Sequence, residues 1–336
     1  MIIDVHGHYT TEPGALQVFR AAQLNGENPA SSALWNEIGD DEVRESVESN
    51  QVRILTGRGG DLMLFSPRAS GMQHHWHDPH VANEWARASN DLVYRVSKQF
   101  PQHFAPVAQL PQTPEGNFDG VLAELRRTVT EFGFVGANLN PDPSGTWAGK
   151  PLTDESWFPV YEAAEELDVP FMVHVSTTEN PNFHTLGAHY LNADTSVFMQ
   201  LLQSDLFTRF PNLRFVIPHG GGAVPFHWGR YRGLAVRNEW QDPSGLLHNV
   251  FFDTAVYHQP GIDLLTEVVP STNVLFASEM LGAVRGADPE TGVEWDDTLV
   301  YVRNAGLSDE DFERITCTNA LRVYPRLAAH LEAVSA

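Results

Sequence analysis

The chain opens on residues 1–10, MIIDVHGHYT, in which a short apolar run leads into two histidines two positions apart. Side chains at positions i and i+2 of a strand point to the same face, so His6 and His8 are expected to emerge together from one strand end. Similar apolar runs recur along the chain and alternate with helical patterns. They cover residues 1–6, 62–67, 104–110, 134–139, 170–175, 214–219, 250–255 and 274–279. Eight strand–helix units in sequence predict an α/β fold, the closed (β/α)8 TIM barrel.

The segments between these runs predict the helices of such a barrel. They cover residues 40–49, 81–100, 118–132, 156–168, 195–210 and 260–269, with one more after 219–225. No linker rich in proline, glycine or serine divides the chain, so residues 1–336 are expected to form a single domain. Long insertions are expected after strands 1, 5 and 8, at 9–39, 176–194 and 280–297. All three follow strand C-termini, the face on which barrel enzymes carry their active sites.

The charge balance restricts the choice of partners. The chain has 21 Lys and Arg against 43 Asp and Glu, a formal net charge of -22, which disfavours binding to nucleic acid or to an anionic membrane. No apolar run approaches the ~20 residues of a membrane-spanning helix, and the opening MIID lacks the features of a signal peptide, so a cytoplasmic location is expected. The single cysteine, Cys317, permits no internal disulfide and is expected to be a packed thiol.

Polar residues of the kinds that bind metals recur at the ends of four predicted strands. They are His6, His8, His174, His219 and Glu279. One histidine at a strand end is more often a hydrogen-bonding residue than a ligand. Five such residues at one barrel mouth instead predict a centre for one divalent metal ion, with zinc favoured and manganese the alternative.

Several motifs resemble the amidohydrolase superfamily, in particular its branch of mononuclear decarboxylases and hydratases. The general resemblance lies in HGH at 6–8, HVS at 174–176 and HGGG at 219–222. Likeness to the hydratases of that branch lies in SPR (66–68), LPQ (110–112), LNPDP (139–143), FPNLRFVIPHGGGAVP (210–225), FDTAVYH (252–258) and SEMLGAVRGADPETG (278–292). Most superfamily members place an aspartate after strand eight, whereas this chain has Glu279 there, as the hydratases do.

The resemblance implies a metal-dependent hydro-lyase that adds water to the carbon–carbon double bond of a small tricarboxylate. It implies that His6, His8 and His174 are metal ligands and that Glu279 is a ligand, a proton carrier or both. We expect His219 to polarise the substrate or to act as a general base. The alternatives are a metal-dependent decarboxylase of an aromatic or unsaturated acid, which would share fold and ligands, and a metal-holding barrel without catalysis.

A tricarboxylate substrate requires cations, which are informative in so acidic a chain. Arg68 follows the second strand, Arg230 lies in the helix after HGGG, and Arg285 lies in the eighth loop. An arginine grips a carboxylate by two parallel hydrogen bonds, although each of these residues could equally pair with a neighbouring acid. Asn140 is expected either to donate its amide to the substrate or to hold its loop's turn.

Three further patterns suggest weaker hypotheses. The glycines of GGG at 220–222 are expected to let the backbone pass close to the metal centre rather than to bind phosphate. The run HHWH at 74–77 suggests a second metal site only weakly. The helix at 81–100 could serve a homo-oligomer as well as the outer ring of a barrel, and an oligomer is expected.

Overall fold

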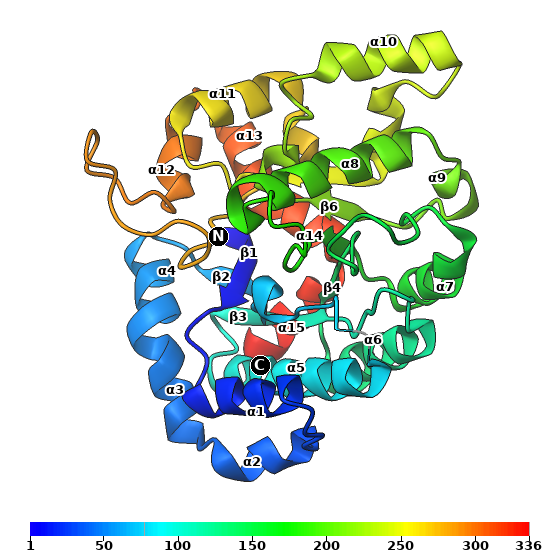
Figure 1. Cartoon of the computed structure of the whole chain (residues 1–336). Coiled ribbons are helices and arrows are strands. Elements are labelled where there is room, and N and C mark those ends of the chain that lie inside the picture. Colours follow the sequence, from blue (N-terminus) through cyan, green and yellow to red (C-terminus); the bar gives the residue numbers. More distant parts are fainter. Residues whose placement is uncertain (77, 336) are drawn as a thin grey trace.

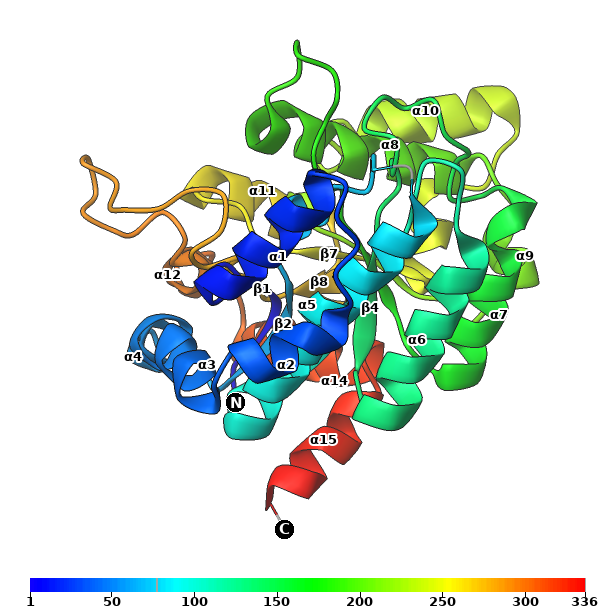
Figure 2. The ribbon, with the colours of Figure 1, turned by 60° about the horizontal axis from the view of Figure 1, so that its bottom comes forward.

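The computed structural model describes residues 1–76 and 78–335 (Figure 1). Eight parallel strands form one sheet in the order β1-β2-β3-β4-β5-β6-β7-β8. The strands are β1 Ile3–Tyr9, β2 Leu62–Pro67, β3 Phe104–Gln109, β4 Gly136–Leu139, β5 Phe171–Val173, β6 Phe215–Ile217, β7 Val250–Asp253 and β8 Val274–Leu275. Strands in sequential order with helices around them (Figure 2) confirm the prediction of a (β/α)8 barrel.

The seam between β8 and β1 closes the barrel through the residues that follow the short strand β8. The amide of Val5 donates to the carbonyl of Phe276 at 3.0 Å. The amide of Glu279 donates to the carbonyl of His6, also at 3.0 Å. Two of the predicted metal-binding residues, His6 and Glu279, therefore lie on opposite sides of this seam.

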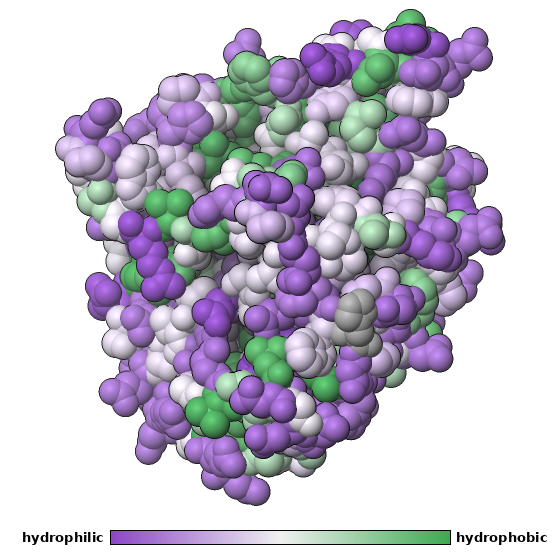
Figure 3. All heavy atoms as spheres, viewed as in Figure 1, coloured by the Kyte–Doolittle hydropathy of each residue, from purple (hydrophilic) through white to green (hydrophobic). Residues whose placement is uncertain are grey.

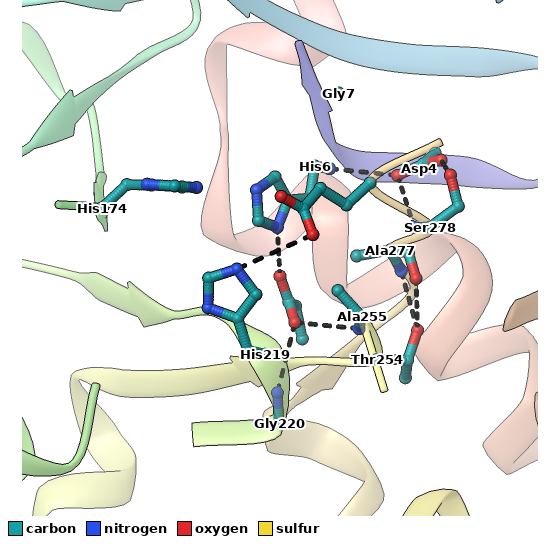
Figure 4. Close-up of polar contacts among 12 residues, drawn as sticks. Asp4, His6, Gly7, His174, His219, Gly220, Thr254, Ala255, Ala277 and Ser278 are labelled. Carbon is teal, nitrogen blue, oxygen red and sulfur yellow. Dashed lines mark hydrogen bonds and ion pairs between the residues drawn. The ribbon is translucent and has the colours of Figure 1, made fainter. Parts of the chain in front are cut away.

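The buried side chain of Asp4 also connects the two sides of the seam. Its carboxylate accepts hydrogen bonds from the amide of Ser278 at 3.1 Å and from the Ser278 hydroxyl (Figure 4). The same carboxylate accepts the amide of His6 at 3.0 Å. Burial raises the pKa of Asp4 to about 6, although these hydrogen bonds oppose the shift.

A β-bulge interrupts β1. The pairing with β2 shifts between Asp4 and Gly7, so that Val5 and His6 together lie opposite Leu64. A regular strand would direct Val5 and His6 to opposite faces. The bulge lets Val5 pack in the barrel interior while His6 and His8 still point inward above it. The strand continues to Tyr9, past the predicted end at residue 6, so both histidines lie within it.

The helices cover the outside of the sheet. In chain order they are α1 Gly14–Leu24, α2 Leu34–Glu37, α3 Asp40–Val47, α4 Arg53–Gly57, α5 Pro79–Gln99, α6 Phe118–Phe132, α7 Phe158–Leu167, α8 Tyr190–Leu202, α9 Leu206–Arg209, α10 Trp228–Asn238, α11 Gln259–Val268, α12 Thr298–Arg303, α13 Asp309–Glu313, α14 Asn319–Val323 and α15 Arg326–Ser335. The expected loop at 9–39 contains α1 and α2, and the expected helix at 195–210 is divided into α8 and α9.

Apolar side chains fill two regions. The larger cluster lies between the strands and the outer helices, where Phe65 and Phe104 contact at 4.6 Å between ring centroids. A second cluster fills the barrel interior and includes Val5 and Leu64. Helix α15 lies at the same end of the barrel as the N-terminus (Figure 2), and Tyr324 just before it belongs to the interior cluster. Cys317 is partly buried against this cluster as a free thiol.

The surface is largely hydrophilic on the face that Figure 3 shows. On that face, apolar residues form small, separate patches. Across residues 1–76 and 78–335, no helix is both long and apolar enough to cross a membrane.

Candidate metal centre

Three imidazoles converge at the C-terminal mouth of the barrel. His6 and His8 come from β1, and His174 follows β5 directly. Nε2 of His8 lies 3.0 Å from Nε2 of His6 and 3.2 Å from Nε2 of His174. All three side chains are buried. Figure 4 shows the rings of His6 and His174 pointing toward a common centre that His219 approaches from a third direction.

The other ring nitrogen of each imidazole has a fixed partner. Nδ1 of His6 contacts Asp253 Oδ2 at 2.8 Å, and Nδ1 of His8 contacts Ser66 Oγ at 2.8 Å. Nδ1 of His174 donates to the carbonyl of the next residue at 2.8 Å. A histidine that donates through Nδ1 leaves an electron pair on Nε2, so the electron pairs of His6 and His174 are both directed at the centre. A cation at the centre would satisfy them, and the donor set therefore fits a divalent metal ion.

The protonation of these rings also suits ligation. Burial, with the neighbouring imidazoles, lowers the pKa of His8 to about 3. Burial likewise lowers the pKa of His174 well below its ordinary value. Both rings are therefore neutral near pH 7, which is the form that binds metals.

His219 and Glu279 complete the group. Ligand atoms of His6, His174, His219 and Glu279 all lie within 4.8 Å of one another, so these four side chains could hold one metal ion. His219 follows β6 and Glu279 follows β8, and both residues have left-handed backbones with φ of 52° and 49°. Positive φ at a residue other than glycine is uncommon and is concentrated at functional sites.

His219 lies between two carboxylates. Its Nδ1 contacts Asp194 Oδ2 at 3.0 Å, and its Nε2 lies 3.8 Å from Glu279 Oε2. Burial alone lowers the pKa of His219, but the bond to Asp194 and the charge of Glu279 outweigh it and hold that pKa well above its ordinary value. Nε2 of His219 is buried and has no hydrogen-bond partner among the described residues. In the protonated ring this nitrogen carries a hydrogen, so it is available to donate to a ligand.

Glu279 is ionised and oriented by its neighbours. Burial alone raises its pKa, but His219 and the other histidines hold the pKa below its ordinary value. The hydroxyl of Tyr257 donates to Glu279 Oε2 at 2.5 Å. Burial raises the pKa of the Tyr257 phenol well above its ordinary value, so this group remains a donor.

A cavity of about 650 Å3 opens beside the centre. His219, Glu279, Tyr190 and Tyr257 line its inner part. Much of the remaining wall is apolar and includes Leu186, Leu191, Phe226, Val256, Leu264 and Val284. The volume suits a small ligand held against the polar inner end.

The predicted substrate-binding arginines have different positions. Arg68 lies 3.0 Å from Glu12 and is 37% exposed. Arg285 is exposed and donates to the carbonyl of Leu281. Arg230 is exposed near the start of α10 and does not line the cavity.

Asn140 belongs to a buried network rather than to the cavity wall. Its amide nitrogen lies 2.9 Å from His74 Nδ1 and 3.2 Å from Ser176 Oγ, and its Oδ1 accepts the amide of Asp142. These bonds are those expected if Asn140 holds the turn of its own loop. His74 also contacts the carbonyl of Leu110 at 3.0 Å, so its ring is engaged within this network. The last histidine of HHWH, at position 77, lies outside the described residues.

Several residues of the site were not predicted. Asp253 ends β7, so the argument from polar strand ends could have found it. Ser66 lies within β2 and belongs to the SPR motif at 66–68. Asp194 lies inside α8, where no sequence pattern distinguishes it from a solvent-facing acid. Tyr257 lies four residues beyond β7, and only the fold brings it to Glu279.

The profile described as amidohydrolase matches residues 3–326. The chain belongs to the amidohydrolase family. This amidohydrolase is 53% identical over 338 residues to 2-keto-4-carboxy-3-hexenedioate hydratase from Sphingobium sp. (strain NBRC 103272 / SYK-6), covering 99% of this chain and 98% of the relative. It is 50% identical to the solved 4-oxalomesaconate hydratase from Rhodopseudomonas palustris, with a TM-score of 0.91 over 100% of this chain and 99% of that one. It is 31% identical over 306 residues to gamma-resorcylate decarboxylase from Rhodococcus jostii (strain RHA1), covering 83% of this chain and 87% of the relative.

Proposed function

We propose that this amidohydrolase is a metal-dependent hydratase that converts 4-oxalomesaconate into 4-carboxy-4-hydroxy-2-oxoadipate. The observation that carries the proposal is the full-length likeness, at 53% identity, to a hydratase named for this substrate. The buried cluster of histidines with Glu279, beside a cavity of about 650 Å3, supports it with suitable chemistry. The decarboxylase alternative is supported by a relative at 31% identity.

The substrate's structure defines what the site must do. The names 4-oxalomesaconate and 2-keto-4-carboxy-3-hexenedioate describe one molecule, a tricarboxylate with a ketone at C2 conjugated to a double bond between C3 and C4. The ketone makes C4 electrophilic. Hydration forms a bond between water oxygen and C4, moves the double-bond electrons toward C3 and the ketone, and ends when C3 takes a proton.

The imidazoles of His6, His8 and His174 would hold the metal, together with Glu279. A divalent ion there would make water nucleophilic near neutral pH by lowering its pKa. Three nitrogen donors and a carboxylate favour zinc, with manganese as the alternative, over magnesium.

Glu279 supplies the proton transfer in this proposal. Its carboxylate is ionised, so it can accept a proton from the attacking water and deliver that proton to C3. Tyr257 holds Oε2, which directs the other oxygen of the carboxylate to the reaction. His219 remains protonated between Asp194 and Glu279, so it is suited to stabilise negative charge that develops on the C2 ketone oxygen.

The cations near the mouth are assigned to the substrate carboxylates. We propose that Arg68 and Arg285 bind the carboxylates of the substrate. Both residues follow strands at this face, and the positive charges of both lower the pKa of Glu12 there. None of the three arginines belongs to the lining of the 650 Å3 cavity, and Arg230 is the weaker candidate because it lies on helix α10 rather than in a loop directly after a strand. Asn140 would act indirectly, by fixing its loop beside the site.

The test is an assay of the zinc-loaded and manganese-loaded protein with 4-oxalomesaconate. Loss of the substrate's conjugated absorbance without release of carbon dioxide is the expected result. Incorporation of solvent deuterium at C3 should accompany it. Release of carbon dioxide in step with substrate loss would replace the hydratase by the decarboxylase.

A further inference from the structure

Arg68 already forms an ion pair with one carboxylate of the protein, that of Glu12. The Arg68 guanidinium lies 3.0 Å from Glu12 Oε1, and the Glu12 side chain is only 6% exposed. Glu12 lies between the end of β1 at Tyr9 and the start of α1 at Gly14, in a segment without helix or strand. The pair thus joins the insertion after β1 to the end of β2, at the mouth of the barrel.

This pair is incompletely satisfied. Glu12 Oε1 is contacted by Arg68 and accepts a hydrogen bond from Gln17 Nε2 at 2.5 Å. Glu12 Oε2 and Arg68 Nε are both buried without a hydrogen-bond partner in the described part of the chain. An arginine and a carboxylate can make two parallel bonds, whereas this pair makes one and leaves one polar atom bare on each side. Glu12 therefore satisfies Arg68 less well than a free carboxylate could.

Arg68 lies two residues beyond Ser66, whose hydroxyl contacts Nδ1 of His8 at 2.8 Å, and the pair lines a small cavity of about 10 Å3 together with Tyr9 and Pro67. Burial raises the pKa of the Tyr190 phenol, and the positive charge of Arg68 partly opposes this rise. The Tyr190 ring stands 4.9 Å from the His174 ring and lines the cavity. Arg285 also acts on Glu12, because burial raises the pKa of Glu12 and the charges of Arg68 and Arg285 lower it. Arg68 is the arginine that contacts Glu12, whereas Arg285 influences that carboxylate only through its charge.

We propose that Glu12 is a competing carboxylate, which holds Arg68 in the free enzyme and is displaced by a carboxylate of the substrate. This inference rests on the proposed function, because it needs a substrate rich in carboxylates. Exchange of one carboxylate for another leaves Arg68 paired with a carboxylate before and after binding. A ligand without a carboxylate at this position cannot make the exchange, and Glu12 thereby selects for polyanionic substrates.

The test compares Glu12→Gln with the wild type. Glutamine keeps the shape of the side chain and removes its charge. The probe is tricarballylate, a saturated tricarboxylate that cannot be hydrated, titrated into the metal-loaded protein by calorimetry. We expect its Kd, and the KM for 4-oxalomesaconate, to fall about tenfold with kcat unchanged, because one charge-assisted contact no longer competes. Glu27→Gln, an exposed residue of the same insertion, is the matched control and should leave both constants unchanged.

A rise in Kd and KM in Glu12→Gln would show that Glu12 positions Arg68 rather than competing with the substrate. An unchanged Kd would equally overturn the proposal. In an Arg68→Met background the effect of Glu12→Gln should disappear, because the cation that contacts Glu12 is absent. A persistent tenfold gain in that background would show a general charge effect and also overturn the proposal.

The probe keeps the two proposals distinguishable. Tricarballylate binding does not depend on turnover, so a protein that binds it with the expected shift but fails to hydrate 4-oxalomesaconate would refute the hydratase and retain the carboxylate exchange. Active wild-type enzyme with no shift in Glu12→Gln would refute the exchange alone. Thermal unfolding of each variant provides the check that the fold is intact.

Discussion

Glu279 is held in place by contacts with three other residues of the site. Its amide bonds to the carbonyl of His6, its Oε2 accepts the hydroxyl of Tyr257, and the same oxygen lies 3.8 Å from His219 Nε2. Its backbone is left-handed at φ 49°. A residue other than glycine keeps such a conformation only where its surroundings determine it. The position of the carboxylate is therefore fixed before any substrate arrives.

Replacing Glu279 by glutamine should separate chemistry from structure. The amide keeps the shape of the side chain but cannot carry the transferred proton. We expect intact folding and retained tricarboxylate binding, with kcat reduced by ~10²–10⁴ at matched metal content. The measurement is the hydration rate, with metal determined on the same sample. A metal-loaded variant that works at the native rate would assign proton transfer to His219 instead.

Asp253 should govern metal affinity without touching the metal. It contacts Nδ1 of His6 at 2.8 Å and so fixes the ring and its tautomer. Asp253→Asn should weaken metal binding by about 10–100-fold, the usual effect of losing such a partner. Competition with a chelator measures this affinity, and Asp263→Asn, an exposed aspartate of α11, is the control. Equal affinity in the two variants would contradict the role of Asp253.

At the scale of elements, the bulge in β1 explains how one strand serves both the barrel interior and the metal centre. Alternation predicts that His6 and His8 share a face, and it does so correctly. It cannot predict that Val5 faces inward as well, because an inserted residue leaves no mark in the pattern. Gly7 follows the bulge, where a Cβ atom would lie 2.2 Å from Met63 Sδ. The glycine is thus required by close packing of β1 on β2.

Gly7→Ala should destabilise the protein through this contact. Met63 is fully buried and its side chain must move to admit the methyl group. We expect the free energy of unfolding to fall by about 1–3 kcal/mol, as for other overpacked cores. Denaturant unfolding measures it, and the loss should shrink in a Met63→Ala background, which provides room. Gly14→Ala, where a Cβ atom meets nothing within 4 Å, should show no such loss.

His74, in the loop after β2, should make the free energy of unfolding sensitive to acid. Burial lowers the pKa of His74 from 6.5 to about 4. Below pH 6.5 the unfolded chain takes up a proton at this ring and the folded chain does not, so stability is lost as pH falls from 6.5 to about 4. The loss attributable to His74 is about 3 kcal/mol by this shift.

Unfolding by urea at pH 7 and pH 4.5, with chelator present, measures that loss. His74→Gln should lower stability at pH 7, because its bonds to Leu110 and Asn140 change, but should lose less between the two pH values than the wild type. His248→Gln, an exposed histidine, should keep the wild-type difference. Equal differences in all three proteins would show that His74 titrates normally.

At the scale of the whole molecule, the sequence was sufficient for the barrel because each strand is a buried apolar run bounded by turns. The ends of those strands also identified His174, His219 and Glu279, since the fold brings all such ends to one mouth. The partners of these residues were not predictable in the same way. Asp194 reaches His219 from inside a helix, and Glu12 reaches Arg68 across 56 positions of sequence. Such contacts depend on tertiary structure, which periodicity does not encode.

The seam between β8 and β1 gives metal binding a consequence for solubility. Because His6 and Glu279 stand on either side of the seam, an ion bound by both joins the two edges of the sheet. Removing the ion should lower the melting temperature and speed hydrogen exchange at the amides of Val5 and Glu279 relative to the rest of the barrel. Mass spectrometry of exchanged peptides measures this, and uniform exchange across the sheet would contradict it.

A barrel that opens there exposes two unpaired strand edges, and unpaired edges add strands from other molecules. Chelated protein should therefore scatter more light on storage than metal-loaded protein of the same concentration, with the first intermolecular contacts forming along β1.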